Sequence, residues 1–289
     1  MSLMAAIKKD EALIAEMDAL RSAQPDFHLW WLGQSGFLLQ WKGKRVLIDP
    51  YLSDSLTKKY ADTSRPHIRM SERVLDPGLL RDISVVTSSH NHTDHLDGET
   101  LVPVLKNNPA IKFIIPEANR NFVAERVKCD INFPIGLNDG ASITVDDFTF
   151  YGVPAKHNEV ERDDRGNSKF MGYVIEFGKW KVYHSGDTVW FDELVEILKP
   201  FAPDLALLPI NGNDPTRGVA GNLDCKEAVE LGKAIDAGYV IPCHYNMFTF
   251  NTADVNNFKK EAGEMDQPVI ILQHGEKFSS SNKSFSISN

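Results

Sequence analysis

The chain lacks any long hydrophobic run. Its longest apolar stretches, such as YVIP and PVIIL, have only a few residues, whereas a helix needs about 20 to cross a bilayer. The N-terminal residues 1–22 carry charged side chains throughout and have no apolar centre of the kind found in signal peptides. We therefore expect no membrane partner and no secretory leader, and we predict a cytoplasmic location.

Cysteine is also scarce. Only three are present, Cys129, Cys225 and Cys243, and they are widely spaced and odd in number. This pattern excludes a disulfide framework and contains no CxxC metal signature. We expect reduced, mostly buried thiols, as is usual for cytoplasmic proteins.

An excess of basic residues is missing as well. The 289 residues include 31 Lys and Arg against 40 Asp and Glu, which gives a formal net charge of −9. Nucleic acids and anionic membranes attract clustered positive charge, so this balance argues against both as partners. A small-molecule substrate is predicted. It can still be anionic, because bound divalent metals would reverse the local field, and a homo-oligomer is left open.

What the chain does have is an alternation of short strands and helices without a low-complexity linker. Residues 5–22 have the spacing of an amphipathic helix, and residues 51–74 form a polar surface excursion. With strands inside and helices outside, we predict an α/β fold with four layers, an αββα sandwich. Its parts are an N-terminal helix, 1–24, packed on a single domain, 25–289. Strands are expected at 28–33, 36–43, 44–50, 82–89, 112–116, 171–178, 179–187, 205–210, 239–244 and 268–273 and within 141–155, and helices at 117–128, 191–199, 225–235 and 253–263.

The most informative stretch is VTSSHNHTDHLDGET, residues 86–100. Three of the nine histidines and one aspartate fall within six positions: His90, His92, Asp94 and His95. If the preceding strand continues, His90 and His92 share one of its faces, since residues i and i+2 do. Asp94 and His95 follow where the chain turns into a helix, so they aim elsewhere. Burying so many ionisable groups without partners is costly, and we therefore predict ligands of two adjacent metal sites.

Four side chains cannot complete two coordination spheres, so further ligands are required. His157, Asp187 and His244 each follow a predicted strand, and imidazole with carboxylate suits Zn²⁺, Mn²⁺ and Fe²⁺. Asp49 in VLIDP also ends a strand. It either forms a turn before Pro50 or accepts hydrogen bonds from ligand histidines and loop amides. The remaining histidines are not counted as ligands: His28, His67, His184 and His274.

HNHTDH matches the HxHxDH signature of the metallo-β-lactamase superfamily. The other motifs follow in the family's order: Asp49, His157, Asp187 and His244. The chain thus resembles this superfamily over nearly its whole length after the first helix. The resemblance implies an αββα sandwich with two divalent metal ions, Zn or Mn, with Fe as the alternative. It assigns one ion to His90, His92 and His157, the other to Asp94, His95 and His244, and a bridging position to Asp187.

A narrower resemblance is carried by FHLWWLGQSGFLL, VLDPGLLRDISVVTSSHNHTDHLDG, VYHSGDTVWF and YVIPCHYNMF. Together they are similar to the L-ascorbate-6-phosphate lactonase branch, also grouped with N-acyl-phosphatidylethanolamine phospholipase D-like hydrolases. The chain departs from that lactonase in being shorter after GEKF, and NGNDPTRG only approximates its loop. The well-known β-lactamases of this fold lack a His directly after the motif aspartate, whereas His95 is present here.

These features predict a hydrolase in which a metal-bridging hydroxide attacks a lactone or ester, such as a sugar-phosphate lactone of the L-ascorbate 6-phosphate type. Asp187 and Asp94 are the candidate catalytic residues: the first fixes the metal separation and the second passes a proton to the leaving group. Arg217 and the basic residues within 58–73 are candidate contacts for a substrate phosphate. The alternatives, in order, are a phosphodiesterase for a cyclic nucleotide or phospholipid headgroup, a thioester hydrolase, and a non-catalytic metal-binding protein.

Overall fold

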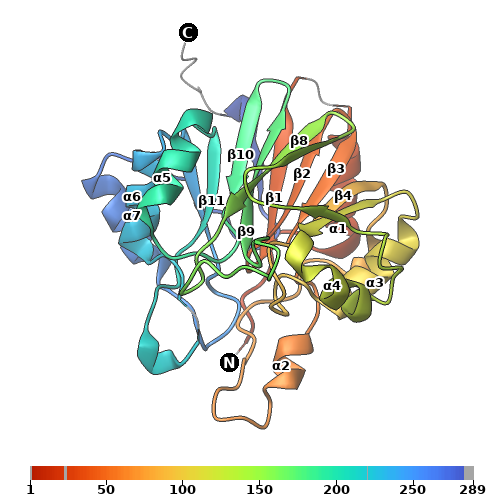
Figure 1. Cartoon of the computed structure of the whole chain (residues 1–289), viewed down its shortest axis with the longest axis horizontal. Coiled ribbons are helices and arrows are strands. Elements are labelled where there is room, and N and C mark those ends of the chain that lie inside the picture. Colours follow the sequence, from red (N-terminus) through yellow and green to blue (C-terminus); the bar gives the residue numbers. More distant parts are fainter. Residues whose placement is uncertain (1, 23–24, 220, 283–289) are drawn as a thin grey trace.

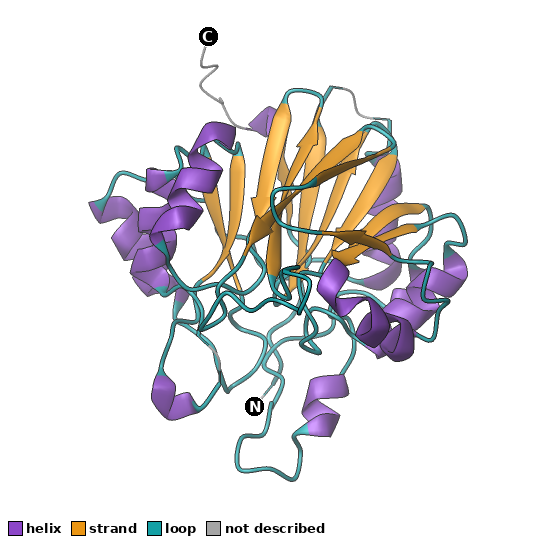
Figure 2. Cartoon of the chain, in the orientation of Figure 1, coloured by secondary structure: helices purple, strands orange, loops and turns teal. Residues whose placement is uncertain are grey.

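Two β-sheets pack against each other at the centre of the molecule (Figures 1 and 2). The computed structural model describes residues 2–22, 25–219 and 221–282. The first sheet has seven strands in the order β13-β1-β2-β3-β4-β5-β6, antiparallel from β13 to β3 and parallel from β3 to β6. Its strands are β1 (Phe27–Gly33), β2 (Gly36–Trp41), β3 (Lys44–Ile48), β4 (Ile83–Thr87), β5 (Lys112–Pro116), β6 (Ile135–Leu137) and β13 (Lys277–Ser279).

The second sheet has six strands in the order β12-β11-β10-β9-β8-β7. It is parallel from β12 to β10 and antiparallel from β10 to β7. Its strands are β7 (Ser142–Val145), β8 (Phe148–Pro154), β9 (Met171–Phe177), β10 (Trp180–His184), β11 (Leu205–Pro209) and β12 (Tyr239–Cys243). Both sheets are therefore mixed, with their parallel strands joined through helices.

Helices cover the outer face of each sheet (Figure 1). The first sheet is covered by α1 (Asp10–Ala19), α3 (Gly98–Asn107) and α4 (Arg120–Val127), and the second by α5 (Asp192–Leu198), α6 (Cys225–Ala234) and α7 (Val255–Glu264). A short helix, α2 (Ser55–Lys59), lies outside these layers within residues 51–74, which we call the excursion. The 3₁₀ turns are Pro77–Leu79, Glu117–Asn119, Lys199–Phe201, Pro215–Arg217 and Ser280–Asn282.

Alternation along the strands explains the layers. In β1, Trp30 and Leu32 pack with the helices of the first sheet, whereas Leu29 and Trp31 pack with the second sheet. Successive strand side chains point to opposite faces, so a strand covered on both faces is apolar at nearly every position. The two faces of the first sheet thus belong to two hydrophobic clusters. One cluster lies between the sheets and under α5–α7, and the other lies under α1, α3 and α4. The predicted four-layer αββα sandwich is confirmed.

The N-terminal helix is shorter than predicted, ten residues instead of 5–22. Leu13 and Met17 of α1 are fully buried in the cluster under the first sheet. The division into residues 1–24 and 25–289 stays a prediction.

The strand predicted at 268–273 is wrong. Val269 makes one isolated bridge with Val240 of β12, after which the chain leaves the sheet edge. Two strands were not predicted, β6 and β13, because three residues are too few to show a period of two.

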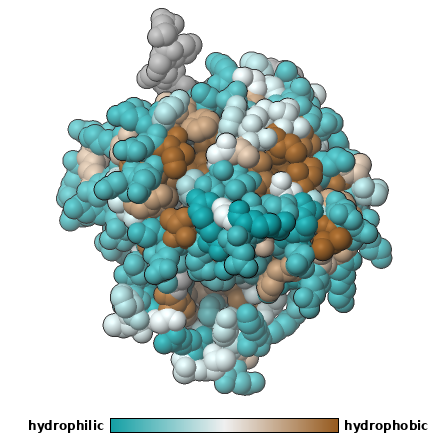
Figure 3. All heavy atoms as spheres, in the orientation of Figure 1, coloured by the Kyte–Doolittle hydropathy of each residue, from teal (hydrophilic) through white to brown (hydrophobic). Residues whose placement is uncertain are grey.

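Hydrophilic side chains cover most of the face shown in Figure 3, and its hydrophobic groups are separated from one another. Within the described ranges 2–22, 25–219 and 221–282, no helix combines the length and the apolar character that crossing a membrane requires. All three cysteines are free thiols, but only Cys243 is buried; Cys129 and Cys225 are partly exposed, whereas mostly buried thiols were predicted. The cytoplasmic location stays a prediction.

Among the strands that share one direction in each sheet, six lead into the site, and they end at the edge near α2 in Figure 1. In the first sheet these are β1, β3 and β4, since β1 and β3 are both antiparallel to β2. In the second they are β8, β10 and β12, since β8 and β10 are both antiparallel to β9. The segments that follow these strands converge and build the site described next.

Candidate metal centre

The segment 88–97 follows β4 and carries four of the predicted ligands. β4 ends at Thr87, so His90 and His92 do not lie on one face of a strand, and that expectation was wrong. The segment instead bends and turns, with Leu96 N donating to the carbonyl O of His92 (2.8 Å). The rings of His90 and His92 nevertheless lie edge to face, with centroids 4.6 Å apart. Loop geometry therefore brings them together where strand geometry was expected to do so.

All seven predicted ligands gather in two adjoining groups. His157 comes from the segment after β8, Asp187 from the segment after β10, and His244 follows β12 directly. Within each group, one nitrogen or oxygen of every residue lies within 4.8 Å of the others. The first group is His90, His92, His157 and Asp187, and the second is Asp94, His95 and His244.

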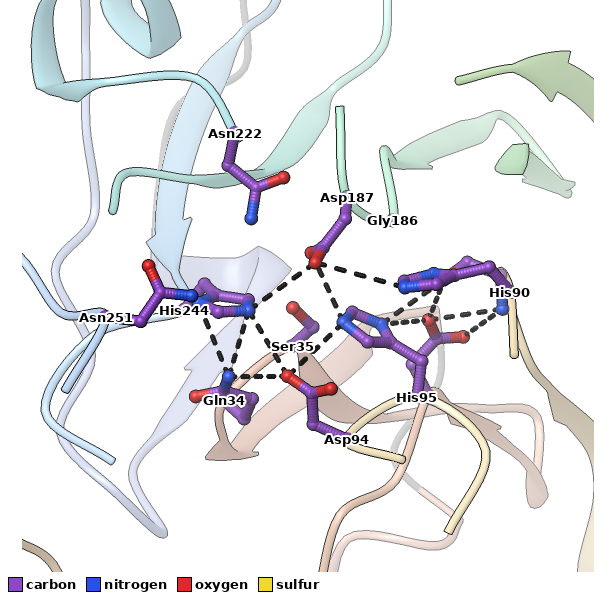
Figure 4. A network of polar contacts seen from close by, with 12 residues as sticks. Gln34, Ser35, His90, Asp94, His95, Gly186, Asp187, Asn222, His244 and Asn251 are labelled. Carbon is purple, nitrogen blue, oxygen red and sulfur yellow. Dashed lines mark hydrogen bonds and ion pairs between the residues drawn. The ribbon is translucent and has the colours of Figure 1, made fainter. Parts of the chain in front are cut away.

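Asp187 lies between the two groups (Figure 4). Its Oδ1 is 3.2 Å from His95 Nε2, and its Oδ2 is 3.6 Å from His244 Nε2. On the other side, Oδ2 is 3.8 Å from His157 Nε2 and 4.0 Å from His90 Nε2. One carboxylate therefore reaches side chains of both groups, as a bridging ligand must.

The donor atoms fit divalent metals. His90 Nε2, His95 Nε2 and Asp187 Oδ1 are buried and have no hydrogen-bond partner among the described residues. Buried polar atoms are rarely left unpaired, so these three require another partner. Zinc binds imidazole nitrogen at about 2.0–2.1 Å, which places two tetrahedral ligands about 3.3 Å apart. The separations of 3.2–4.0 Å around Asp187 match that spacing.

Asp49 sets the orientation of His95 directly and that of His90 through Ser89. It is fully buried, and its carboxylate accepts hydrogen bonds from His95 Nδ1 (2.8 Å), Ser89 N (3.0 Å) and the Ser89 hydroxyl. Because the Ser89 hydroxyl donates to Asp49, it is free to accept from His90 Nδ1, 3.0 Å away. When neutral, both imidazoles would then carry their proton on Nδ1 and direct the Nε2 lone pair to the centre, the form that binds a metal.

A third imidazole is fixed in the same way by the backbone. His157 Nδ1 lies 2.8 Å from the carbonyl O of Gly221, which can only accept. The proton is therefore on Nδ1, and Nε2 faces the centre. His92 differs from these, since it is exposed on the open side of the site.

Buried charge dominates the centre. Burial alone would raise the pKa of Asp187, but His95 and His244 beside it hold that pKa well below its usual range. Burial alone would lower the pKa of His95, but Asp187 and Asp94 raise it well above its usual range. The carboxylates thus retain positive charge on the neighbouring imidazole. A divalent cation would replace that proton, so we expect metal affinity to rise with pH.

A pocket of about 550 Å³ opens above the centre. The excursion supplies Lys59, Tyr60 and Arg65 to one wall, while Phe248 and Phe250 form part of another. The excursion was predicted as a polar surface segment whose basic residues are candidate substrate contacts, and two of these, Lys59 and Arg65, line the pocket. A substrate bound in this pocket can therefore contact the excursion.

Arg217, a predicted substrate contact, is not among the residues that line this pocket, and its contact with substrate stays a prediction. Its guanidinium donates to Asn251 Oδ1 (2.7 Å) and to two backbone carbonyls, one of them Asn211 O (2.8 Å). These bonds tie two segments of the pocket rim together. Arg65 lines the pocket instead, and its Nη1 donates to the carbonyl O of Gly218 (2.8 Å).

Sequence reasoning missed Gln34, which contacts two predicted ligands. Its Nε2 lies 2.8 Å from Asp94 Oδ2 and 2.9 Å from His244 Nε2 (Figure 4). Gln34 follows β1 within LGQSG, at the same end of a strand as the predicted ligands. That relation was the signal that could have identified it.

The remaining histidines do not join either group. His184 is buried, with Nε2 2.9 Å from the carbonyl O of Ser35, and it accepts from Gly186 N (3.3 Å) through Nδ1. His28 is buried, with Nδ1 2.8 Å from the Ser279 hydroxyl oxygen, and His274 is also buried away from both groups. His67 lines the pocket.

Gly186, next to Asp187, cannot be replaced without distortion. Its φ is +60°, and a Cβ there would lie 2.6 Å from Ser89 Cβ and 2.8 Å from the carbonyl O of Met171. We expect Gly186→Ala to lower the free energy of unfolding by about 2–4 kcal/mol and to weaken metal binding, because Asp187 must shift. Chemical denaturation and elemental analysis measure the two effects.

Gly140→Ala is the matched control for Gly186→Ala. Gly140 also has a positive φ of +75°, but a Cβ there meets nothing within 4 Å. It should cost only the backbone strain, about 1 kcal/mol, with metal content unchanged. Equal effects of the two substitutions would show that contact with Ser89 is unimportant.

The comparisons with known proteins agree with this fold and site. Residues 44–245 match the family model described as "Beta-lactamase superfamily domain". With the αββα layers and the paired His/Asp groups, the match defines the class: the chain is a member of the metallo-β-lactamase superfamily. A UPF0173 metal-dependent hydrolase of Methanosarcina mazei is 33% identical over 257 residues, which covers 87% of this chain and 97% of that protein. The chain belongs to the UPF0173 metal-dependent hydrolase family.

Solved structures show the same fold. The chain is similar to Igni18, a novel metallo hydrolase from Ignicoccus hospitalis, with 25% identity, a TM-score of 0.63, and coverage of 88% of this chain and 98% of that one. It is also similar to an isothiocyanate hydrolase from Delia radicum gut bacteria, with 21% identity, a TM-score of 0.68, and coverage of 87% and 98%. The second likeness concerns the fold alone. Placement in the lactonase branch stays a prediction.

Proposed function

We propose that this protein hydrolyses a lactone or ester that carries an anionic group, using two divalent metal ions. The observation that supports it most is the pair of adjoining ligand groups with Asp187 between them, at the floor of a pocket. Two ions held there would supply Lewis acidity and lower the pKa of water towards neutrality. The ions are Zn or Mn, with Fe as the alternative, because imidazole and carboxylate accept all three.

In this proposal, each of the two ligand groups holds one metal ion. His90, His92 and His157 hold one ion, and Asp94, His95 and His244 hold the other. Asp187 contributes to both and keeps them at a fixed separation. Asp49 keeps His95 in the protonation form and orientation that binding requires.

Asp94 is the group best placed to move a proton. Its Oδ2 accepts from Gln34 and lies 3.3 Å from His244 Nε2, whereas its Oδ1 makes no hydrogen bond within the part of the chain that the structure describes. The side chain is 15% exposed and lines the pocket, so Oδ1 can reach a bound substrate. In the proposed reaction it carries a proton to the leaving oxygen as the C–O bond breaks.

The charge of the pocket favours an anionic substrate. Lys59 and Arg65 line it, and neither has a carboxylate partner among the described residues. Among the described residues, the carboxylates that line the pocket are Asp94 and Asp187, which the metal ions would neutralise. The pocket is thus positive in a protein of net charge −9, and a sugar-phosphate lactone of the L-ascorbate 6-phosphate type combines the required ring and anion.

We expect the double substitution Lys59→Met and Arg65→Met to raise KM for a phosphorylated lactone by about 10- to 100-fold, since two charged contacts are lost. KM for the unphosphorylated lactone should change little. Steady-state kinetics of the zinc- or manganese-loaded protein on a panel of lactones, with and without phosphate, measures this. Lys58→Met is the matched control, because the neighbouring Lys58 pairs with Glu99 (2.8 Å) and does not line the pocket.

Two results would count against the proposal. If the metal-loaded protein hydrolyses no lactone or ester of the panel, the proposed reaction is wrong. If the double variant loses activity equally on the phosphorylated and the unphosphorylated lactone, Lys59 and Arg65 do not bind the anionic group, although the protein can still be a hydrolase.

The same cations also favour a phosphodiesterase as the second candidate. Lys59 and Arg65 can bind a phosphodiester as well as a remote phosphate. If the protein hydrolyses bis(p-nitrophenyl) phosphate much faster than any lactone, it is a phosphodiesterase.

A further inference from the structure

Gln34 lies in a backbone conformation that disfavours a side chain. It is the first residue of the two-residue turn between β1 and β2 and has a φ of +50°, where glycine is preferred. Its carbonyl O accepts from His244 N (3.0 Å) and from Trp31 Nε1 (3.0 Å). The turn is thus held by the segment that carries a predicted ligand. A non-glycine residue kept in such a position suggests that its side chain has a use.

The Gln34 amide faces the second ligand group (Figure 4). Nε2 lies 2.8 Å from Asp94 Oδ2, and an ionised carboxylate can only accept, so this end of the amide is the NH₂ group. One N–H therefore donates to Asp94. Nε2 also lies 2.9 Å from His244 Nε2, so the second N–H can donate there when that imidazole nitrogen carries no proton. The side chain is only 3% exposed, yet it lines the pocket.

The contact with His244 competes with metal binding. His244 Nε2 is 3.3 Å from Asp94 Oδ2 and 3.6 Å from Asp187 Oδ2, so it is the atom that faces the other ligands. When Nε2 carries no proton, its single lone pair can serve a Gln34 N–H or a cation, but not both. When a cation is bound, this N–H loses its acceptor, while the bond to Asp94 still fixes the amide in place. A donor held beside the centre then requires a new acceptor.

We propose that Gln34 is a catalytic residue whose amide donates a hydrogen bond to the substrate oxygen that gains negative charge during hydrolysis. The inference rests on the proposed hydrolase function. No bond to Gln34 is made or broken: the N–H donates throughout, and the charge develops on the carbonyl oxygen under attack. A donor already oriented by Asp94 needs no reorganisation at that moment, which is what makes such donors effective.

The substitution that tests this is Gln34→Met, which has similar length and no donor. Each protein is loaded with zinc and three quantities are measured: ions per chain, kcat and KM on the best substrate of the panel, and the Kd of inorganic phosphate as a tetrahedral oxyanion. We expect Gln34→Met to keep its metal content, to lose about 100-fold in kcat with KM nearly unchanged, and to bind phosphate about 10-fold more weakly.

Gln267→Met is the matched control. Gln267 is also a buried glutamine, and its Nε2 donates to the carbonyl O atoms of Ala237 (3.2 Å) and Pro268 (3.1 Å), away from the pocket. Its replacement should lower the melting temperature without changing kcat, KM or phosphate binding. A general loss of packing would affect both variants alike.

The outcomes separate the two proposals. Loss of an ion in Gln34→Met would mean that Gln34 acts only through Asp94 and His244, and would overturn its contact with substrate. The contact with substrate is also overturned if Gln34→Met retains its metal and has wild-type kcat and wild-type phosphate affinity. The same holds if neither protein binds phosphate. If the wild type turns over no substrate but still binds phosphate more tightly than Gln34→Met, the proposed reaction fails and the donor role stands.

Discussion

Asp187→Asn should reduce hydrolysis by about 10³-fold or more and release at least one of the two metal ions. The carboxylate of Asp187 lies within 4.0 Å of histidine Nε2 atoms from both groups. An amide supplies one neutral oxygen in place of two anionic ones, so it cannot serve both ions. It also leaves an NH₂ donor facing imidazole nitrogens that must bind metal. Elemental analysis of the purified variant and steady-state kinetics measure the two effects.

Asp204→Asn is the control for Asp187→Asn. Asp204 is a partly buried carboxylate at the opposite end of β10 and β11, where it accepts from Lys181 N (2.8 Å). An asparagine there can still accept that bond, so metal content and activity should be unchanged. If Asp187→Asn keeps two ions per chain and wild-type activity, Asp187 is not shared between the sites and the dinuclear proposal fails.

The fold could be predicted because the strands carry their own signal. Strands covered on both faces, such as LWWL in β1, are nearly all apolar, and glycines separate them into short segments. The superfamily motifs could be recognised for a related reason. His157, Asp187 and His244 each stand just after a strand, and strand ends are where an α/β sandwich collects its functional side chains.

The rest of the site depends on contacts between distant segments, which no local pattern contains. Gln34 meets Asp94 across 60 residues and His244 across 210. Lys59 and Arg65 belong to a run of basic candidates for substrate contact, and only the folded path of the excursion shows that these two line the pocket. Arg217 was the reverse case: a cation near the right motif that the folded chain uses to hold its own backbone.

The turn after β1 links several parts of the site in one small region. Gln34 contacts the second ligand group, and the carbonyl of Ser35 lies 2.9 Å from His184 Nε2. His184 in turn accepts from Gly186 N, directly before Asp187. The position of the bridging carboxylate is therefore coupled to the first sheet through a hydrogen-bonded chain. This coupling explains why a two-residue turn, far from the HNHTDH motif in sequence, contributes to the geometry of the centre.

Asp49→Asn is the second substitution with a large expected effect. Asp49 is fully buried and receives at least three donors, from Thr87 Oγ1 (3.2 Å), Ser89 N (3.0 Å) and His95 Nδ1 (2.8 Å). An asparagine has one acceptor oxygen, so its NH₂ group must face one of these donors. We expect the free energy of unfolding to fall by about 1–3 kcal/mol and metal affinity to fall about 10- to 100-fold.

The reason for the metal effect lies in the imidazole of His95. If the asparagine NH₂ group points at His95 Nδ1, that nitrogen must accept, and the ring proton moves to Nε2. Nε2 is the atom that faces Asp187 (3.2 Å), so the proton would occupy the position of the metal. Isothermal titration with Zn²⁺ and chemical denaturation of the metal-free protein measure the affinity and the stability separately.

Asp97→Asn is the matched comparison for Asp49→Asn, because Asp97 is 1% exposed and also carries a buried carboxylate close to the HNHTDH motif. Its oxygens accept from Glu99 N and Thr100 N at the start of α3, and asparagine caps helices about as well as aspartate. Asp97→Asn should therefore leave metal affinity unchanged and cost little stability. If the two variants bind Zn²⁺ equally well, Asp49 holds the loop but does not set the protonation of His95. If only Asp49→Asn binds Zn²⁺ more weakly, and by more than its loss of stability explains, then Asp49 sets the protonation of His95.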